Sequence, residues 1–377
     1  MGLPDLRLVP SIVGGDPSSR RSIVAAKSIP AKKYDIKTGE PVSLAMRKCP
    51  ELVVVRPDFS LYHECSEAFI AICREYAPVV EQASIDECYL DMTGTELIYP
   101  DIIATAYEIK NKIRDQLGFT VNIGIGNNKL SAKMASDFEK PDKVHTLFRS
   151  EISEKMWPLP IGELFLCGKS SVSKLRAMQI NTIGDLAKSD PSYIKMLLGE
   201  KGGTMLYCYA NGIDDSPVSD EYEEAKSYGN STTLEENITT TEEANQILLM
   251  LSDTVSRRMR KDSARASCVA VTIRDTEFNN KSHQRHLLES TDISGEIYQV
   301  ATELFREIWD GKTPLRLLNI TLSGVSSEDE PMQLSLFSDE SKEKSRKMDR
   351  AADAIRDRFG SGAIRRGSEM VSKKITK

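Results

Sequence analysis

The first strong hydrophobic pattern covers residues 60–77, where apolar side chains recur at the spacing of one face of an α-helix, and Ser60 can cap its start. A short strand around 83–85, a tight corner at Asp86-Glu87 and a second strand at 88–91 should follow. Beyond them the pattern predicts a helix opened by Pro100, a strand at 119–125 and a short helix at 128–138. This order is that of a βαββαβ ferredoxin-like unit without its first strand.

The second half of the chain predicts another unit of this kind, after the acidic segment 214–225. One strand should end at 233–234, and Thr240 with Glu243 forms a capping box for the next helix. The rest of the pattern predicts strands at 268–273, 284–288 and 315–322 and a helix at 293–309, which complete βαββαβ.

Residues 160–212, between the two units, should be helical with short loops. Gly168 and Lys169 stand before a helix in a helix-hairpin-helix pattern, whose backbone N–H groups can bind a DNA phosphate. An ordinary helical hairpin is the alternative interpretation. After the second unit, 326–346 is polar and predicted to be disordered apart from the apolar island 333–337, and 347–360 can form an amphipathic helix.

Composition narrows the class of protein. A chain of 377 residues should hold more than one domain, and its 40% hydrophobic and 28% charged content is that of a globular protein. No apolar run is long enough to span a membrane, and the start lacks the pattern of a signal peptide. Seven scattered cysteines without a CxxC pair indicate a reducing, cytoplasmic setting with neither disulfides nor zinc.

The distribution of charge says more than the net charge of −6. Residues 1–50 hold nine Lys and Arg against four Asp and Glu, and residues 257–285 hold eight against three. Residues 214–224 between them hold six acids and no base. Two basic patches suit a protein that contacts DNA at chosen places, and ordinary solvated surface charge is the alternative.

The segment 84–91 (SIDECYLD) carries the most specific chemistry. Asp86 and Glu87 are adjacent carboxylates at a strand–turn–strand corner, where they repel each other. A solvated turn could hold them, but between two apolar strands their repulsion favours a site for cations, and Mg²⁺ is the usual cation for carboxylates that also meet phosphates.

This segment, together with 124–144 (GIGNNKLSAKMASDFEKPDKV) and 26–41 (AKSIPAKKYDIKTGEP), resembles the Y-family translesion DNA polymerases. The resemblance runs from about Val9 to about Ser326, with three motifs in the family's order. It implies an α+β right-hand polymerase: fingers (1–58), a ferredoxin-like palm (59–145), a helical thumb with helix-hairpin-helix (146–215), a linker (216–225), an α/β little finger (226–326) and a tail (327–377). A polymerase that acts as a monomer is expected.

The resemblance also implies roles for individual residues. Asp86 and Glu87 match the palm carboxylates that hold two catalytic Mg²⁺ ions. Residues expected to bind the incoming dNTP are Lys32, Lys33, Tyr34 and Lys140. Lys32 stands where many members have arginine, so the bidentate fork is lost, and Ile29 stands where tyrosine is frequent. Residues expected to contact primer–template DNA are Gly168, Lys169, Arg257, Arg258, Arg260, Lys261, Arg265, Arg274 and Arg285.

Two further features follow from the resemblance. The family has a strand before the finger segment that bears another metal-binding aspartate, followed by an aromatic residue that blocks ribonucleotides. Here Met1 stands almost at the finger segment, and Asp5 and Asp16 are poor substitutes, so we expect a truncated palm with weak activity. The island with Gln333, Leu334, Leu336 and Phe337 resembles the peptide by which bacterial polymerases bind the sliding clamp.

Two alternative functions remain open. A non-catalytic remnant that binds DNA and the clamp would also lack the first aspartate. A nucleotidyl cyclase uses paired carboxylates on a similar palm, but the helix-hairpin-helix pattern and the basic patches count against it, because a cyclase needs no duplex.

Overall fold

The computed structural model describes residues 5–221, 224–327, 340–360 and 362–364. The chain divides into two compact units, one formed by residues 1–57 with 223–377 and the other by 58–222. The divisions fall within a residue of the expected end of the fingers and inside the expected linker. Each unit is described by itself.

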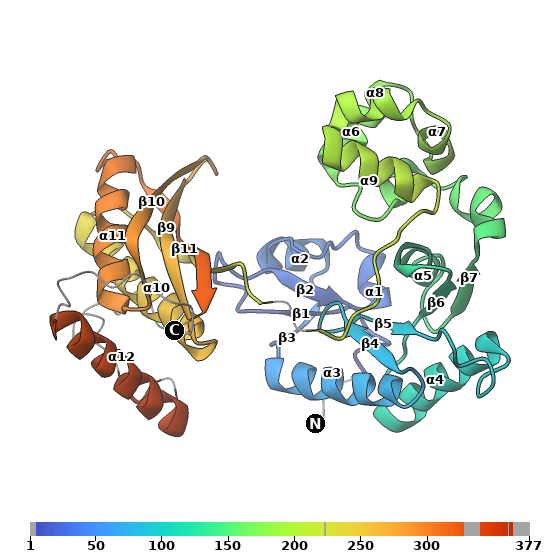
Figure 1. The fold of residues 1–377 in the computed structure, drawn as a ribbon, viewed down its shortest axis with the longest axis horizontal. Coiled ribbons are helices and arrows are strands. Elements are labelled where there is room, and N and C mark those ends of the chain that lie inside the picture. Colours follow the sequence, from blue (N-terminus) through green and yellow to red (C-terminus); the bar gives the residue numbers. More distant parts are fainter. Residues whose placement is uncertain (1–4, 222–223, 328–339, 361, 365–377) are drawn as a thin grey trace. The chain divides into compact units, whose positions relative to one another are not determined.

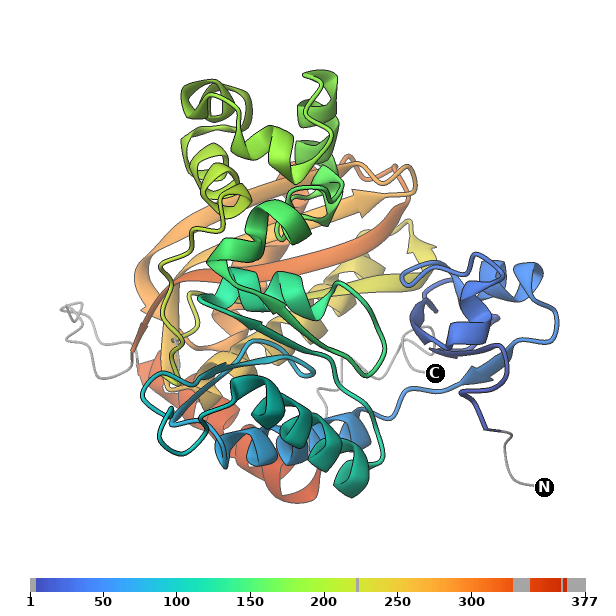
Figure 2. The same cartoon turned by 90° about the vertical axis from the view of Figure 1, so that its right-hand side faces the viewer.

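The palm segment holds α3 (Phe59–Arg74), β4 (Val79–Gln82), β5 (Cys88–Asp91), α4 (Ile102–Leu117), β6 (Ile123–Gly126), α5 (Lys129–Ser136) and β7 (Val144–Leu147). Helices α3 and α4 lie side by side next to β4 and β5 (Figures 1 and 2). Their shared core includes Phe69, Ile72, Val80, Ile109 and Ile113.

Two local predictions in the palm are wrong in detail. The first strand lies at Val79–Gln82, because 83–85 belongs to the turn. Helix α3 begins at Phe59, and its N-cap is Asp58, whose carboxylate accepts a hydrogen bond from the Leu61 N–H, in place of Ser60.

The palm strands form two separate pairs. Strands β4 and β5 pair antiparallel, and β6 and β7 pair parallel. Within the described residues, β5 and β6 share no ladder of hydrogen bonds, and every residue of both strands is only half-buried. The strands expected to form one palm sheet therefore form two short ones.

Two glycines let α5 pack against β6. A Cβ on Gly124 would lie 1.9 Å from the Ala132 carbonyl oxygen, and one on Gly126 would lie 2.2 Å from the Ser131 hydroxyl. Asn128 caps α5, because its side chain accepts a hydrogen bond from the Ser131 N–H. The close approach fixes the helix that carries Lys129 and Lys133.

The thumb segment consists of short helices whose apolar core is continuous with Leu130, Met134 and Ala135 of α5 and Leu147 of β7. They are a 3₁₀ turn (Arg149–Glu151), a π turn (Ile152–Met156), a second 3₁₀ turn (Ile161–Glu163), α6 (Lys169–Ala177), α7 (Ile183–Ala187), α8 (Pro191–Leu198) and α9 (Glu200–Ala210). Gly199, at φ +87°, makes the sharp turn between α8 and α9.

The finger segment forms a three-stranded sheet in the order β2-β1-β3. Its elements are β1 (Ser11–Gly14), β2 (Val24–Lys27), α1 (Ile29–Lys32), α2 (Val42–Lys48) and β3 (Val53–Val55). Ile12, Val24 and Val42 form part of its buried core.

The little finger is a four-stranded antiparallel sheet in the order β10-β9-β11-β8. Its elements are β8 (Ser227–Ile238), α10 (Thr241–Lys261), β9 (Ala264–Asp275), β10 (Asn280–Thr291), α11 (Ser294–Ile308) and β11 (Leu315–Ser327). Both helices pack on one face of the sheet (Figure 1). Thr240 caps α10, because its hydroxyl accepts a hydrogen bond from the Glu243 N–H.

Helix α12 (Glu340–Phe359) follows the little finger. The helix predicted at 347–360 therefore begins earlier, and the prediction of disorder is wrong for 340–346. Ion pairs to the little finger hold this stretch. The island 333–337 lies outside the described residues. No helix in the described part of the chain is long and apolar enough to cross a membrane.

Candidate active site and DNA-binding surfaces

The β4–β5 hairpin places Asp86 and Glu87 at its tip. The N–H groups of Ala83 and Ser84 both donate to the Glu87 carbonyl, at 3.0 and 3.1 Å, which closes the turn. The Ser84 hydroxyl donates to Oδ1 of Asp86 at 2.7 Å and orients that carboxylate. Both acidic side chains are exposed, so ligands can reach them from solvent.

Helix α5 brings positive charge to this corner. Lys133 donates to Oε1 of Glu87 at 2.5 Å and lies 3.3 Å from the carboxylate of Asp137. Burial opposes its charge, but these two carboxylates raise the pKa of Lys133. Lys140 in turn pairs with Asp137 at 2.7 Å. A chain of alternating charge thus connects Glu87 to the predicted triphosphate-binding lysine.

A third carboxylate, that of Glu81, lies on β4, the strand that precedes the Asp86–Glu87 turn. Glu81 in β4 accepts two hydrogen bonds from Lys129, each at 2.7 Å, and one from the Ser219 N–H at 3.0 Å. These donors already use both of its oxygens. Glu81 therefore has a structural role that ties α5 and the chain near Ser219 to the palm.

The described residues at the Asp86–Glu87 corner provide part of a metal-binding site. Among the described residues, no group of three or more His, Cys, Asp or Glu side chains is placed to hold a metal ion. Asp86 and Glu87 do provide adjacent, solvent-facing oxygens of the kind that Mg²⁺ prefers. The pair fits one side of a divalent site whose other ligands are water, phosphate or a further carboxylate.

The expected triphosphate-binding residues of the fingers lie at the end of α1. Lys32 and Lys33 are exposed, and the Ser28 hydroxyl caps the helix before them. Tyr34 donates its phenolic hydrogen to Glu51 at 2.7 Å, and this bond raises the pKa of Tyr34 to about 12. Ile29, where the family often has tyrosine, is 57% exposed. The two lysines are adjacent and exposed, so they present positive charge at this end of α1.

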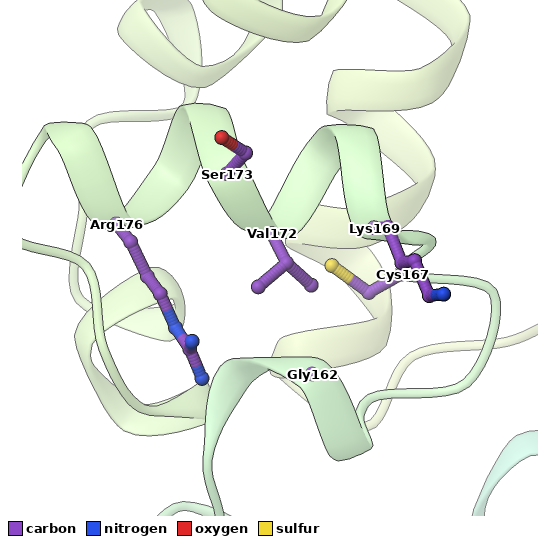
Figure 3. A pocket seen from close by; sticks show the side chains of 6 residues that line it. All are labelled: Gly162, Cys167, Lys169, Val172, Ser173 and Arg176. Atoms are coloured by element: carbon purple, nitrogen blue, oxygen red, sulfur yellow. The ribbon is translucent and has the colours of Figure 1, made fainter.

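The predicted helix-hairpin-helix turn lies beside a pocket of about 470 Å³ in the thumb. Gly168 is the N-cap of α6, and a Cβ there would meet open space. The residues lining the pocket come from α6, the turn before it and the 3₁₀ turn at Ile161–Glu163 (Figure 3): Gly162, Cys167, Lys169, Val172, Ser173 and Arg176. Sequence reasoning missed Arg176, although its separation of two helical turns from Lys169 was a usable signal.

The basic residues predicted on α10 have intramolecular partners. Arg257 donates to Asp357 at 2.6 Å, and Arg260 donates to Asp353 at 2.7 Å, both on α12. Arg258 donates to the Gly229 carbonyl, while Lys261 is exposed. Their role in DNA binding stays a prediction.

The predicted basic residues of the sheet are also engaged. Arg285 pairs with Glu303 and Glu307 of α11, on the helix-covered side. Arg274 donates to Asn280 across the β9–β10 pair at 2.7 Å. Arg265 is half-buried and also has an interaction partner within the protein.

The opposite face of the little-finger sheet is a surface that sequence reasoning missed. Residues that pair across the four strands form rows on this face. One row consists of Ser231, Asn319, Thr272 and Ser282. Thr272 and Ser282 hydrogen bond to each other at 3.0 Å, while neighbours such as Val271 and Ile320 face the helices and are fully buried. This face is polar and hydroxyl-rich, and Arg274 lies on it. Only the pairing of distant strands reveals it.

The chain is similar to known protein families over most of its length. Two family models described as impB/mucB/samB family match residues 1–137 and, for the C-terminal domain, 225–336. A third, described as the DNA polymerase-iota thumb domain, matches 167–214. Together with the relatives below, these matches show that the chain belongs to the Y-family DNA polymerases.

The relatives named DNA polymerase IV extend over nearly the whole chain. The protein of Clostridium acetobutylicum is 42% identical over 96% of this chain and 90% of its own length. That of Acetivibrio thermocellus is 38% identical over 97% and 92%. DNA polymerase IV 1 of Bacillus subtilis is 37% identical over 97% and 88%.

Solved structures agree on the fold. A Y-family DNA polymerase chimera of Dbh and Dpo4 aligns with a TM-score of 0.76 at 23% identity, covering 86% of this chain and 94% of its own. DinB from Sulfolobus solfataricus aligns with a TM-score of 0.55 over 85% and 93%. The predicted polymerase fold with a helix-hairpin-helix thumb is confirmed.

Proposed function

We propose that this protein is a template-directed DNA polymerase that extends primers opposite damaged or undamaged template. The observation that supports the proposal most directly is the exposed Asp86–Glu87 pair at the hairpin tip, within a chain related over almost its whole length to polymerases IV. The scattered cysteines suit a reducing, cytoplasmic setting for this activity, and we expect the enzyme to act as a monomer.

The proposed chemistry is phosphoryl transfer from a dNTP to the primer 3′-OH. Bound Mg²⁺ would lower the pKa of that hydroxyl and neutralise charge that develops on the triphosphate. Asp86 and Glu87 would hold these ions. Lys140, Lys32 and Lys33 would orient the triphosphate, and no covalent intermediate on the protein is needed.

We propose two surfaces for primer–template DNA. The N–H groups at the start of α6, with Lys169 beside them and Arg176 two turns further along the same pocket, offer donors and positive charge to backbone phosphates. The hydroxyl-rich face of the little-finger sheet offers short donors and acceptors along four strands. Such groups contact phosphates and base edges without strong sequence preference.

The proposal includes the sliding clamp as a partner. Gln333, Leu334, Leu336 and Phe337 resemble a clamp-binding peptide, with two apolar anchors suited to a pocket on a ring-shaped protein. The distance in sequence between this peptide and the palm predicts that clamp binding and nucleotide transfer can be lost separately.

The separate β4–β5 and β6–β7 pairs support a further part of the proposal. One more strand between them would join the two pairs and could carry the third carboxylate of the metal site. We expect a version in which a relative's N-terminal strand and helix join the two pairs to extend primers faster than residues 1–377 alone.

Primer extension with Mg²⁺ and all four dNTPs tests the proposal. In the extended version, Asp86→Ala and Glu87→Ala should each reduce the rate by roughly 10²–10³-fold or more, by analogy with the loss of one electrostatic stabiliser. Asp115→Ala, an exposed acid on α4, is the matched control and should leave the rate unchanged.

Near-normal rates in either palm variant would overturn the metal assignment. The alternative, a remnant that binds DNA and the clamp, requires that the extended version bind primer–template yet add no nucleotide. Robust Mg²⁺-dependent extension by the 377-residue chain alone would refute the need for a further strand.

A further inference from the structure

Helix α12 has its charged side chains where a surface helix normally has apolar ones. Five of the residues that contact the little finger recur every three or four positions and are all charged: Lys342, Arg346, Asp349, Asp353 and Arg356. Asp349 and Arg356 are buried in this contact. The face that normally carries the hydrophobic stripe is therefore held by ion pairs.

The little finger matches this face with the opposite charges in order. Glu289 accepts from Lys342 at 3.1 Å, and the fully buried Asp292 accepts from Arg346 at 2.8 Å. Further along, Arg260 binds Asp353 at 2.7 Å. At the far end, Asp253 binds Arg356 at 2.7 Å. Because a basic block and an acidic block of α12 each face the opposite charge on the little finger, the contact sets the rotation of α12 about its own axis.

The opposite face of α12 carries its large apolar side chains. Met348, Ile355 and Phe359 are 60%, 39% and 67% exposed, with the small Ala351 between them. Their spacing of seven and four residues places them on one stripe, about 16 Å long at 1.5 Å per residue. Packing this stripe on the little finger would have hidden it, yet the charge pattern turns it to solvent.

We propose that this outer stripe of α12, namely Met348, Ala351, Ile355 and Phe359, is a second docking surface for the sliding clamp. The inference rests on the proposed function, in which the clamp binds residues 333–337. Glu340, where α12 begins, follows Phe337 by three residues, a span of at most about 11 Å. A ring that holds the peptide is therefore close to the first turns of α12.

Charge beside the stripe narrows the chemistry of the partner. Lys344 and Lys347 are exposed on this side of the helix, and the Arg358 guanidinium lies 5.2 Å from the centre of the Phe359 ring. The matching surface is an apolar groove with an acidic rim. A helix with apolar and basic residues also suits an anionic bilayer, which the experiment must distinguish.

The experiment measures the affinity of the full chain for a purified bacterial sliding-clamp ring by calorimetry. The variant Met348→Gln/Ile355→Gln/Phe359→Gln keeps helix-forming residues and touches no ion pair to the little finger. It should bind the ring about tenfold or more weakly, because the second of two linked contacts is lost. The matched control, Glu343→Gln, changes an exposed charge of the same helix outside the stripe and should bind normally.

Each outcome decides a separate point. If the parent chain does not bind the ring, the clamp part of the proposed function fails and this inference fails with it. A second outcome is that the parent binds the ring, that Leu336→Ala/Phe337→Ala abolishes binding and that the stripe variant binds normally. In that case only this inference is overturned. If the stripe substitutions weaken binding to vesicles of anionic phospholipid but leave binding to the ring unchanged, the stripe is a membrane-binding surface and this inference is overturned. Circular dichroism of the stripe variant should match the parent, which separates lost docking from lost helix.

Discussion

Arg260 is the residue on which the docking of α12 should depend most. Its guanidinium side chain is 5% exposed and donates to Asp353 at 2.7 Å, to the Asp292 carbonyl at 2.6 Å and to the Ser294 hydroxyl at 3.2 Å. Asp349, itself 5% exposed, lies 3.5 Å away. The variant Arg260→Met keeps an unbranched apolar stem, shorter than arginine, and removes the charge and the hydrogen-bond donors.

Removing one partner of a buried ion pair typically costs about 3–5 kcal/mol, because the remaining charges stay buried without compensation. Here the protein can relieve that cost by releasing α12, which returns Asp349 and Asp353 to water. The penalty should therefore appear as undocking of α12 and leave the little-finger core intact. At 1.4 kcal/mol per factor of ten, a loss of about 3 kcal/mol increases the open population roughly 100-fold.

Amide hydrogen exchange is the suitable assay, because it reports α12 separately in a protein of several domains. In Arg260→Met, amides of α12 should exchange roughly 100-fold faster, while those of β9 and β11 keep their rates. Lys347→Met is the control, since the partner of Lys347 within the described residues is Glu343, in an exposed pair at 3.6 Å worth about 0–1 kcal/mol. Unchanged protection of α12, or equal acceleration throughout the little finger, would refute the reasoning.

Three further predictions concern the other segments. Gly124→Ala should destabilise the palm by about 2–3 kcal/mol or more, because its Cβ would meet the Ala132 carbonyl oxygen at 1.9 Å, and urea unfolding followed in the 58–222 unit measures the loss. Arg274→Ala should lower the slope of log K for DNA against log salt, whereas Arg285→Ala should not, since only Arg274 lies on the open sheet face; equal slopes would contradict the proposed DNA surface. Asp185 completes the capping box of α7, whose N-cap is Thr182, by accepting from the Thr182 and Asn181 N–H groups, and these bonds lower the pKa of Asp185. Its stabilisation is therefore present above pH about 4 and is lost as the pH falls, so Asp185→Ala should cost about 1 kcal/mol at neutral pH and should remove that part of the acid sensitivity.

Several elements of the fold were predictable from local sequence patterns. Strand β5 has the predicted bounds, and the Asp86-Glu87 corner precedes it, because apolar residues and a polar turn are adjacent in the chain. The Thr240 cap of α10 was predictable for the same reason, since its partner is three residues away. The missed positions of β4 and of the α3 cap are shifts of a few residues, where Asp58 offered a better acceptor than Ser60.

The amino-acid sequence by itself determined the family, the order of the elements and the carboxylate corner, because each depends on residues close together in the chain. Tertiary structure decided which charges are available and which faces are open. Arg257 meets Asp357 across 100 residues, and Arg260 meets Asp353 across 93. The open sheet face likewise exists only once β8, β9, β10 and β11 pair. A composition or a periodicity cannot report such partners, since the free energy of an ion pair depends on distance and burial in space.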